Sequence, residues 1–160
     1  MDSIDLDILR LIQVDSRRPA GDIAREIGLS GSATRDRLLR LELSGAVLAQ
    51  RAILDPEQLG LRLCAFLFVE LDVKADEQAF AAEMQRLPMV QEAHRITGPH
   101  GWLLKLRLRD ASALRALVGN HIRPYFEARR IETIVVLDTL KETTELALQG
   151  APRPALSVVS

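Results

Sequence analysis

The spacing of hydrophobic residues changes near Leu61, and this change limits the chain to an arrangement in two parts. Before it, apolar residues recur at helical intervals, as Ile4, Ile8 and Leu11 do on one face of a helix. After it, apolar residues alternate, and residues 64–73 (CAFLFVELDV) are typical of a strand. With 160 residues, the chain is long enough for two small domains.

The first part contains three short helical patterns that are separated by tight turns. Ser3 is available as an N-cap for the first helix. Gly28 is suited to end the second helix, and Ser30 to cap a third helix that ends at Gly45. A β-compatible stretch follows at residues 46–54. A short helix, a tight turn, a capped helix and a β extension together predict a winged helix-turn-helix.

The second part is expected to mix strands and helices. Its order, β-α-β-β-α-β, is that of the ferredoxin-like sandwich, so the expected fold class of the whole chain is α+β. The expected elements are strands at residues 64–73, 90–97, 102–109 and 131–140 and helices at residues 76–87 and 111–122. We expect the helix-turn-helix domain and its β linker at residues 1–61, the sandwich domain at 62–143, and a tail at 144–160 that is loose at its end.

Arginines are concentrated around the third helix, although the net charge of the whole chain is only −1. Residues 17–51 carry seven arginines against four acidic residues, which is a local charge of +3. In a helix-turn-helix, the second helix enters the major groove of DNA with its N-terminal residues near the bases. We therefore predict that double-stranded DNA is a partner. The candidate DNA-binding residues are Ser30, Ser32, Ala33, Thr34, Arg35, Asp36, Arg37 and Arg40.

Spacing alone leaves two other interpretations of this helix open. Arginines on an exposed helix are often only solvated, or paired with neighbouring acids such as Asp36 and Glu42. Three-helix units also serve as dimerisation modules. Binding to a palindromic DNA site that weakens as salt is added would favour the interpretation as a DNA-binding helix.

Several short motifs, taken together, resemble one family of regulators. Residues 4–61 resemble the N-terminal half of the Lrp/AsnC transcription regulators, also called the feast/famine family. Residues 90–110 (VQEAHRITGPHGWLLKLRLRD) resemble the effector domain of that family, and residues 135–141 (VVLDTLK) resemble its closing strand. The features that match in the first part are Ile4-Asp5, Ile8-Leu9, Asp15 with Arg17, Ile23-Ala24, Gly28-Leu29-Ser30, Arg37, Arg40-Leu41-Glu42, Gly45 and Leu59-Gly60.

The resemblance implies a winged helix-turn-helix joined to a ferredoxin-like domain that senses a ligand. It also implies homodimers formed through the sandwich domain, their assembly into octamers, and an amino-acid effector bound near a Thr-Gly loop between subunits. The effector-binding residues that it implies here are Thr97, Gly98, Pro99, His100, Gly101, Trp102 and Thr133.

The loop departs from the family at Gly101. The family usually has an acidic residue just before the aromatic residue of this loop, and that carboxylate is suited to the ammonium group of an amino acid. A buried ammonium without a partner is costly, so another acceptor is needed here. Trp102 in place of a smaller aromatic residue is also expected to change the shape of the pocket.

The strand at residues 64–73 is apolar on both faces near its start. Ala65, Leu67 and Val69 fill one face, while Phe66 and Phe68 lie on the other. A strand that is apolar on both faces is usually covered on both. In a chain this small we expect the second cover to be another subunit, and we predict that Phe66 and Phe68 lie in a dimer interface.

The sequence contains few features of other functional classes. Cys64 is the only cysteine, which excludes an intramolecular disulfide and a cysteine-rich zinc site. The three histidines are too scattered for a metal site, so we expect neither a metal nor a cofactor besides the effector. The N-terminus lacks the pattern of a signal peptide, and no apolar run is long enough to span a membrane. We therefore expect a cytoplasmic protein without a membrane partner.

Two other functions are weighed against a regulator. No phosphate loop, nucleophile elbow or spaced acid–base pair is present, so we expect no enzyme. Some tetrapyrrole-decarboxylating enzymes, of the sirohaem type, resemble the same two-domain fold, and their candidate residues here are His94, Arg95 and His100. A ligand-binding module without DNA binding is disfavoured by the intact helix-turn-helix.

Overall fold

The fold is described from a computed structural model of the chain, which covers residues 1–148 except for the side chains of residues 124 and 125. The chain packs into two units, and each is described by itself. Among the described residues, one unit contains Met1–Ala52 together with residues 142–148, and the other is Ile53–Lys141. No helix in the described part of the chain is long and apolar enough to cross a membrane.

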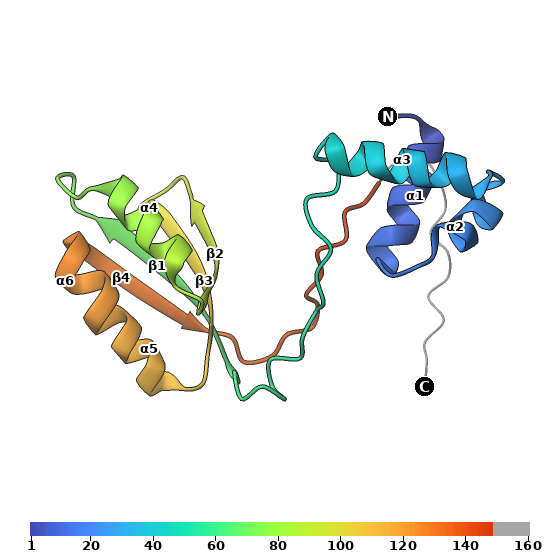
Figure 1. Ribbon diagram of the computed structural model, residues 1–160. Helices are drawn as coiled ribbons and strands as arrows, with labels where there is room; N and C mark the ends of the chain where they lie inside the picture. The colour runs from blue at the N-terminus through green and yellow to red at the C-terminus, as the bar shows by residue number, and fades with distance from the viewer. Residues whose placement is uncertain (149–160) are drawn as a thin grey trace. The chain divides into compact units, whose positions relative to one another are not determined.

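The first unit is helical. It contains α1 (Ser3–Val14), α2 (Ala20–Ile27) and α3 (Gly31–Leu43), which pack around a small apolar core (Figure 1). The fully or nearly buried members of this core are Ile8, Ile23 and Leu41. The predicted helix-turn-helix is therefore confirmed in its helices.

The caps at the helix ends agree with the sequence in two of three cases. Gly28 ends α2 in the left-handed conformation with φ of 71°, which favours glycine. The Ser30 side chain accepts a hydrogen bond from the backbone N–H of Ala33 at 3.2 Å and so caps α3. The predicted cap of α1 is wrong by one position, because Asp2 forms a capping box with Asp5 and Ser3 is the first helical residue.

The predicted β extension after α3 is not a strand in this chain. Residues 46–54 have no regular structure, and the next strand begins at Leu63. A strand needs a partner for its backbone N–H and C=O groups, and the described residues of the helical unit contain none. The structure thus contains the helices of the predicted winged helix-turn-helix, but residues 46–54 do not form the wing.

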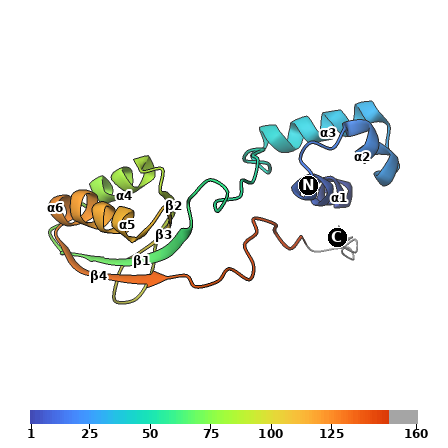
Figure 2. The same cartoon turned by 90° about the horizontal axis from the view of Figure 1, so that it is seen from below.

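The second unit is a four-stranded antiparallel sheet with its helices on one face, as Figure 2 shows. The strand order is β2-β3-β1-β4, which is the ferredoxin-like order and confirms the expected α+β class. Its elements are β1 (Leu63–Leu71), α4 (Glu77–Arg86), β2 (Val90–Arg95), β3 (Trp102–Leu108), α5 (Ala111–Leu117), the π-helical turn η1 (Val118–Ile122), α6 (Arg123–Phe126) and β4 (Ala128–Val135).

Two elements of this unit differ from the predicted limits. The helix that begins at Ala111 continues as η1 and α6, and Pro124, which has no backbone N–H, stands near the start of α6. The last strand lies earlier than predicted and ends at Val135, where it pairs with Ala65. One more backbone hydrogen bond follows, from the Val136 N–H to the Cys64 carbonyl at 3.0 Å, before the chain leaves β1.

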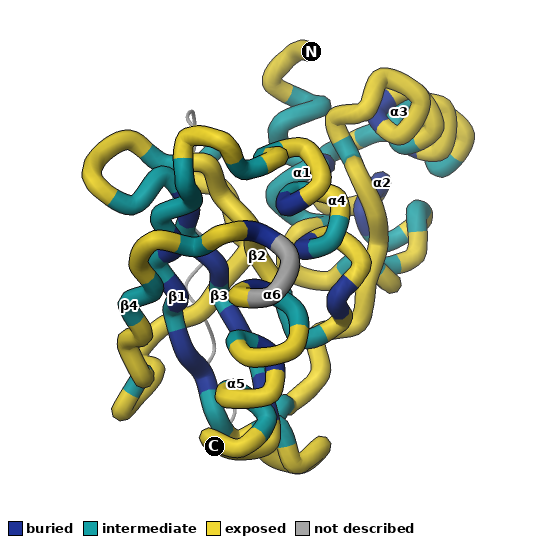
Figure 3. The backbone as a smooth tube through the Cα atoms, turned by 90° about the vertical axis from the view of Figure 1, so that its left-hand side faces the viewer, coloured by how far each residue is buried: buried dark blue, intermediate teal, exposed yellow. Residues whose placement is uncertain are grey.

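The core of the sheet unit lies between the sheet and the helices. Leu67, Val69, Leu104 and Leu106 are fully buried on the helix-facing side of the two central strands, with Phe80 and Met84 of α4 against them. Figure 3 shows buried positions alternating with less buried ones along β1 and β3. The alternation leaves the opposite face of the sheet, with Phe66 and Phe68, without a helix; we call it the open face.

The boundaries of the two packed units differ from the predicted domain boundaries, both before and after the sheet unit. The first boundary falls at Ala52 instead of residue 61, and residues 142–148 pack with the helices. The remainder of the predicted tail, from residue 149, lies outside the described residues. We retain residues 1–61, 62–143 and 144–160 as a proposal for the functional domains, since the predicted limits follow the change of hydrophobic period.

Candidate DNA-binding helix and effector loop

One side of α3 is exposed and carries polar side chains. Ser32, Arg35, Asp36 and Arg40 are all exposed there. Within the described part of the chain, no ion pair is formed by Arg35 or Arg40. These two guanidinium groups are therefore available to an anion, which fits the predicted role of this helix.

Three other residues predicted on this surface also have a structural role at the start of α3. Thr34 is fully buried, and its hydroxyl donates a hydrogen bond to the Ser30 carbonyl at 3.1 Å. Ser30 is the helix cap and also lies 3.1 Å from the Ser32 hydroxyl. Ala33 is half-buried and donates the capped N–H. These three of the eight predicted residues form the hydrogen bonds that cap the start of α3.

Arg37 likewise has a structural role, at the start of α1. Its guanidinium donates to Asp2 and to Asp5, both at 2.7 Å, and its side chain is 21% exposed. The Arg37 hydrogen bond is the main cause that lowers the pKa of Asp2. The pKa of Asp5 is lowered by the Asp2 backbone N–H and by Arg37, and both carboxylates raise the pKa of Arg37. Arg37 thus fastens α3 to the start of α1.

Two further arginines of the basic stretch are also paired within the unit. Arg18 forms an ion pair with Glu26, and Arg25 forms one with Asp22. Three of the seven arginines of this stretch, Arg18, Arg25 and Arg37, are therefore paired. Arg35 and Arg40 of α3, like Arg17 and Arg51 outside it, have no ion pair within the described residues. Composition alone could not make this distinction.

In the sheet unit, the predicted effector loop is the connection between β2 and β3. Gly98 and Gly101 have φ of 107° and 78°, a region that favours glycine. The Ile96 N–H donates to the Gly101 carbonyl at 2.8 Å and closes the turn. Thr97 is exposed at the start of the loop. The sequence Thr-Gly-Pro-His-Gly therefore forms a tight turn. A side chain at residue 101 would strain the backbone of this turn.

His100 turns from this loop onto the open face of the sheet. Its ring lies 5.3 Å from the ring of Phe68, and its Nε2 lies 3.5 Å from the Glu132 carboxylate. The side chain is 14% exposed, and its Nδ1 is buried with no hydrogen-bond partner among the described residues. His100, Phe68 and Glu132 thus form a small group, which we call the loop cluster.

Trp102 and Thr133, which are also predicted for the effector site, lie on β3 and β4 and not in the loop itself. Trp102 is 8% exposed and packs edge-to-face on Phe80 in the core, with ring centroids 5.1 Å apart. Thr133 pairs with Leu67, so it lies on the helix-facing side of the sheet. Glu132, which sequence reasoning missed, occupies the face of the loop cluster. Strand alternation would have indicated it, because neighbouring residues of β4 point to opposite faces.

The open face combines apolar residues with a charged edge. Phe66 and Phe68 of β1 lie beside Leu103 of β3 and Ile134 of β4 by the strand register. At the β2 edge, the hydrogen bond from Lys105 and then that from His94 lower the pKa of Glu92. The structure therefore places Phe66 and Phe68 on one surface, as predicted, without testing whether a second subunit covers it.

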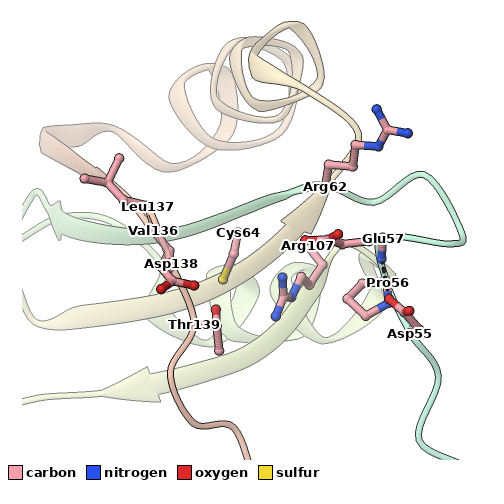
Figure 4. A pocket seen from close by; sticks show the side chains of 10 residues that line it. All are labelled: Asp55, Pro56, Glu57, Arg62, Cys64, Arg107, Val136, Leu137, Asp138 and Thr139. Carbon is pink, nitrogen blue, oxygen red and sulfur yellow. Dashed lines mark hydrogen bonds between the residues drawn. The ribbon is translucent and has the colours of Figure 1, made fainter.

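A polar cavity of about 360 Å³ lies where the connecting segments leave the sheet (Figure 4). Its wall contains Arg62 and Arg107 together with the carboxylates of Asp55, Glu57 and Asp138. It is assembled from the segment before β1, from β3, and from the segment after β4. The sequence did not indicate this cavity, because these three segments are far apart along the chain.

The residues considered for a metal or an enzyme do not converge. Among the described residues, no group of three or more histidine, cysteine, aspartate or glutamate side chains is arranged to hold a metal ion. His94 lies 3.2 Å from Glu92 on the open face, while Arg95 pairs with Glu77 of α4 on the other side. His100 belongs to the loop cluster. The three candidates for tetrapyrrole chemistry thus have separate glutamate neighbours.

Comparison with known proteins gives two matching families. Residues 1–42 match the AsnC-type helix-turn-helix domain, and residues 64–146 match the Lrp/AsnC ligand binding domain. The chain is 31% identical to the leucine-responsive regulatory protein of Salmonella typhimurium, over 93% of this chain and 92% of that protein. It is 32% identical to the proline dehydrogenase transcriptional activator of Rhizobium radiobacter, over 89% of this chain and 93% of that protein.

Solved structures agree with these matches. A transcriptional regulator of Neisseria meningitidis in complex with L-Met has a TM-score of 0.87 and 30% identity, covering 93% of this chain and 97% of that chain. AsnC of E. coli has a TM-score of 0.83 and 26% identity, covering 91% and 97%. These relatives are named as regulators, which favours regulation over tetrapyrrole chemistry. The chain belongs to the Lrp/AsnC family of transcriptional regulators, with a DNA-binding helix-turn-helix followed by a ligand-binding domain.

Proposed function

We propose that this regulator reads DNA through Ser32, Arg35, Asp36 and Arg40 of α3. The observation that carries the proposal is their common exposure on a capped helix, where both arginines lack an intrachain ion pair in the described part of the chain. Guanidinium groups bind phosphate or the guanine edge, and a carboxylate accepts from the cytosine amino group. Ser32 lies in the first turn of α3, where base contacts are made in this motif.

The test of this proposal is the affinity for a selected DNA site. Arg35→Ala and Arg40→Ala should each weaken binding by about 1–3 kcal/mol, which is roughly 5- to 150-fold. Arg109→Ala in the sheet unit removes the same charge from an exposed position and is the matched control. If the control weakens binding as much as the α3 variants do, α3 does not carry the contact. A lower salt dependence in the α3 variants is expected as well.

We further propose that the effector is an amino acid and that Glu132 helps to hold its ammonium group. The L-Met complex of the Neisseria regulator supports this class of ligand. Gly101 supplies no carboxylate, whereas Glu132 provides one beside His100 of the same loop. An ammonium group that is taken out of water needs such a partner. Thr97 and the loop backbone from Gly98 to Gly101 complete the proposed site.

Titration calorimetry with individual amino acids tests the effector proposal. Glu132→Gln should weaken the response at least tenfold, while Glu70→Gln, on another strand of the same sheet, should leave it unchanged. Equal binding by the protein and Glu132→Gln would contradict the role of Glu132. A bound tetrapyrrole with a haem-type absorbance band would favour the enzyme instead.

For assembly, we propose a homodimer through the open face of the sheet and association of dimers into an octamer. Four apolar side chains of three strands lie on this face, and no helix of the described chain covers it. Two copies would present two copies of α3 to successive turns of DNA. For the localisation of this DNA-binding protein, we propose the cytoplasm. We propose neither a metal, a cofactor nor a catalytic activity.

A further inference from the structure

The segment after β4 returns to the helical unit and contacts α1. Gln13, in the last turn of α1, donates from its side-chain amide to the Leu146 carbonyl at 3.1 Å. The backbone N–H of Leu146 donates in turn to the Gln13 side-chain oxygen, also at 3.1 Å. One glutamine side chain thus satisfies both backbone groups of one residue, as a neighbouring strand would.

A second side chain on the same face of α1 supports this contact. Arg10 stands three residues before Gln13, and its Nη2 donates to the Leu148 carbonyl at 3.4 Å. The Leu146 side chain is 70% exposed, so this residue is held against α1 by its backbone groups and not by apolar packing of its side chain. The segment itself is shaped by a hydrogen bond from the Glu145 N–H to the Thr143 hydroxyl at 3.1 Å.

This contact ties the two units together a second time along the chain. In Figure 1 the chain runs between them once in the teal segment after α3 and once in the orange segment after β4. The second connection starts at Val136, whose N–H donates to the Cys64 carbonyl, and reaches its anchor ten residues later at Leu146. The first connection runs twenty residues, from Leu43 at the end of α3 to Leu63 at the start of β1.

The lengths of the two connections decide which one limits motion. An extended chain spans at most about 3.5 Å per residue, so the first connection allows about 70 Å and the anchored second one about 35 Å. We propose that residues 142–148 are a tether that docks on Arg10 and Gln13 of α1 and restricts the positions that the DNA-binding unit can take. Gln13 is its positioning residue. The span of this anchored connection limits how far the DNA-binding unit can move from the sheet unit. It thereby sets which spacings of DNA half-sites a dimer can bind.

Hydrogen exchange of the full-length protein tests the anchor without any DNA. The Leu146 amide should exchange at least tenfold faster in Gln13→Ala than in the unchanged protein. Gln85→Ala is the matched control, because Gln85 is an exposed glutamine in the last turn of α4. A chain that ends at Glu145 lacks the anchor, while a chain that ends at Leu148 keeps it. Unchanged exchange at Leu146 in Gln13→Ala would overturn the anchor.

The consequence for DNA rests on the proposed function and is measured separately. Affinity is compared for palindromes whose half-sites are moved apart by about 5 base pairs, which is half a helical turn. Gln13→Ala and the chain ending at Glu145 should lose at least threefold less affinity on this change than the unchanged protein and the chain ending at Leu148. Identical losses would overturn the tether. If none of the proteins binds DNA, the proposed function fails while the exchange result still decides the anchor.

Discussion

At the scale of single residues, pairing decides which arginines can serve DNA. Arg37 is held by Asp2 and Asp5, while Arg35 and Arg40 project from the same helix without an intrachain ion pair in the described chain. An arginine that is already bonded to two carboxylates offers little to a phosphate. We therefore expect Arg37 to act through the position of α3 and not through direct contact with DNA.

The ion pairs of Arg37 with Asp2 and Asp5, which we call the clamp, make the stability of the helical unit sensitive to acid. Asp2 and Asp5 have lowered pKa values, so their stabilising effect is present above the ordinary aspartate pKa and is lost as the pH falls through the lowered values. Arg37→Met should therefore lower the melting temperature at pH 7, and the gap to the unchanged protein should close below about pH 4.

Circular dichroism melting curves between pH 3 and pH 8 measure this gap. Arg25→Met is the control, because Arg25 is 80% exposed and its partner Asp22 lies on the same helix. A gap for Arg37→Met that has the same size at the lowest and the highest pH would show that the aspartates do not carry the clamp.

At the scale of elements, the turn between α2 and α3 sets how the recognition helix leaves the unit. Gly28 adopts φ of 71°, whereas Gly21 lies inside α2 without a positive φ, and neither has an atom close to the site of an added Cβ. The two glycines therefore differ in backbone conformation and not in the space around them. They form a matched pair for the same substitution.

Gly28→Ala should lower the free energy of unfolding by about 1 kcal/mol, because a left-handed conformation strains a residue with a Cβ. Gly21→Ala should raise it by about 0.5 kcal/mol, because alanine favours a helix. Urea denaturation followed by circular dichroism measures both changes. If the two variants shift stability in the same direction, the turn does not depend on the left-handed residue.

Elements defined by local patterns could be predicted from the sequence, and those defined by distant partners could not. The spacing of Ile4, Ile8 and Leu11 predicted a helix and the alternation in β1 predicted a strand, because each of these signals lies within one element. The extension after α3 has no strand partner among the described residues of its unit. The limits of β4 depend on its pairing with β1, a segment distant in the chain.

The candidate sites show the same division. Caps and turns such as Ser30 and Gly98 could be predicted because their role is local. The ion pair of Arg37 with Asp2 joins residues 35 positions apart, and no periodic pattern indicates it. The place of Glu132 beside His100, and of residues 142–148 beside α1, likewise depends on tertiary contacts between segments distant in the chain.

At the scale of the whole molecule, the open face of the sheet is expected to make the protein a dimer. Phe66→Asp with Phe68→Asp should prevent association, since burial of each phenylalanine is worth about 1.5–3 kcal/mol and a buried charge adds a further cost. Light scattering of the purified protein should then report a monomer. Val73→Asp is the control, because Val73 is 90% exposed beyond β1.

A double variant that remains a folded dimer would place the interface elsewhere. A variant that is insoluble can be replaced by Phe66→Ser with Phe68→Ser, which removes the apolar area without adding charge. The same proteins bear on DNA binding, since a monomer presents one copy of α3 and should lose affinity for a palindrome while keeping its affinity for a half-site.

Selection of bound sequences from random DNA tests the central claim most directly, that the exposed side of α3 reads DNA in a dimer. The protein should enrich a palindrome whose half-sites are about 10 base pairs apart or a multiple of that distance. Arg40→Ala should enrich the same spacing with a relaxed base preference within each half-site, and Arg109→Ala should enrich the unchanged palindrome. Enrichment of no sequence by the protein, or of the same bases to the same degree by Arg40→Ala and Arg35→Ala, would contradict this account.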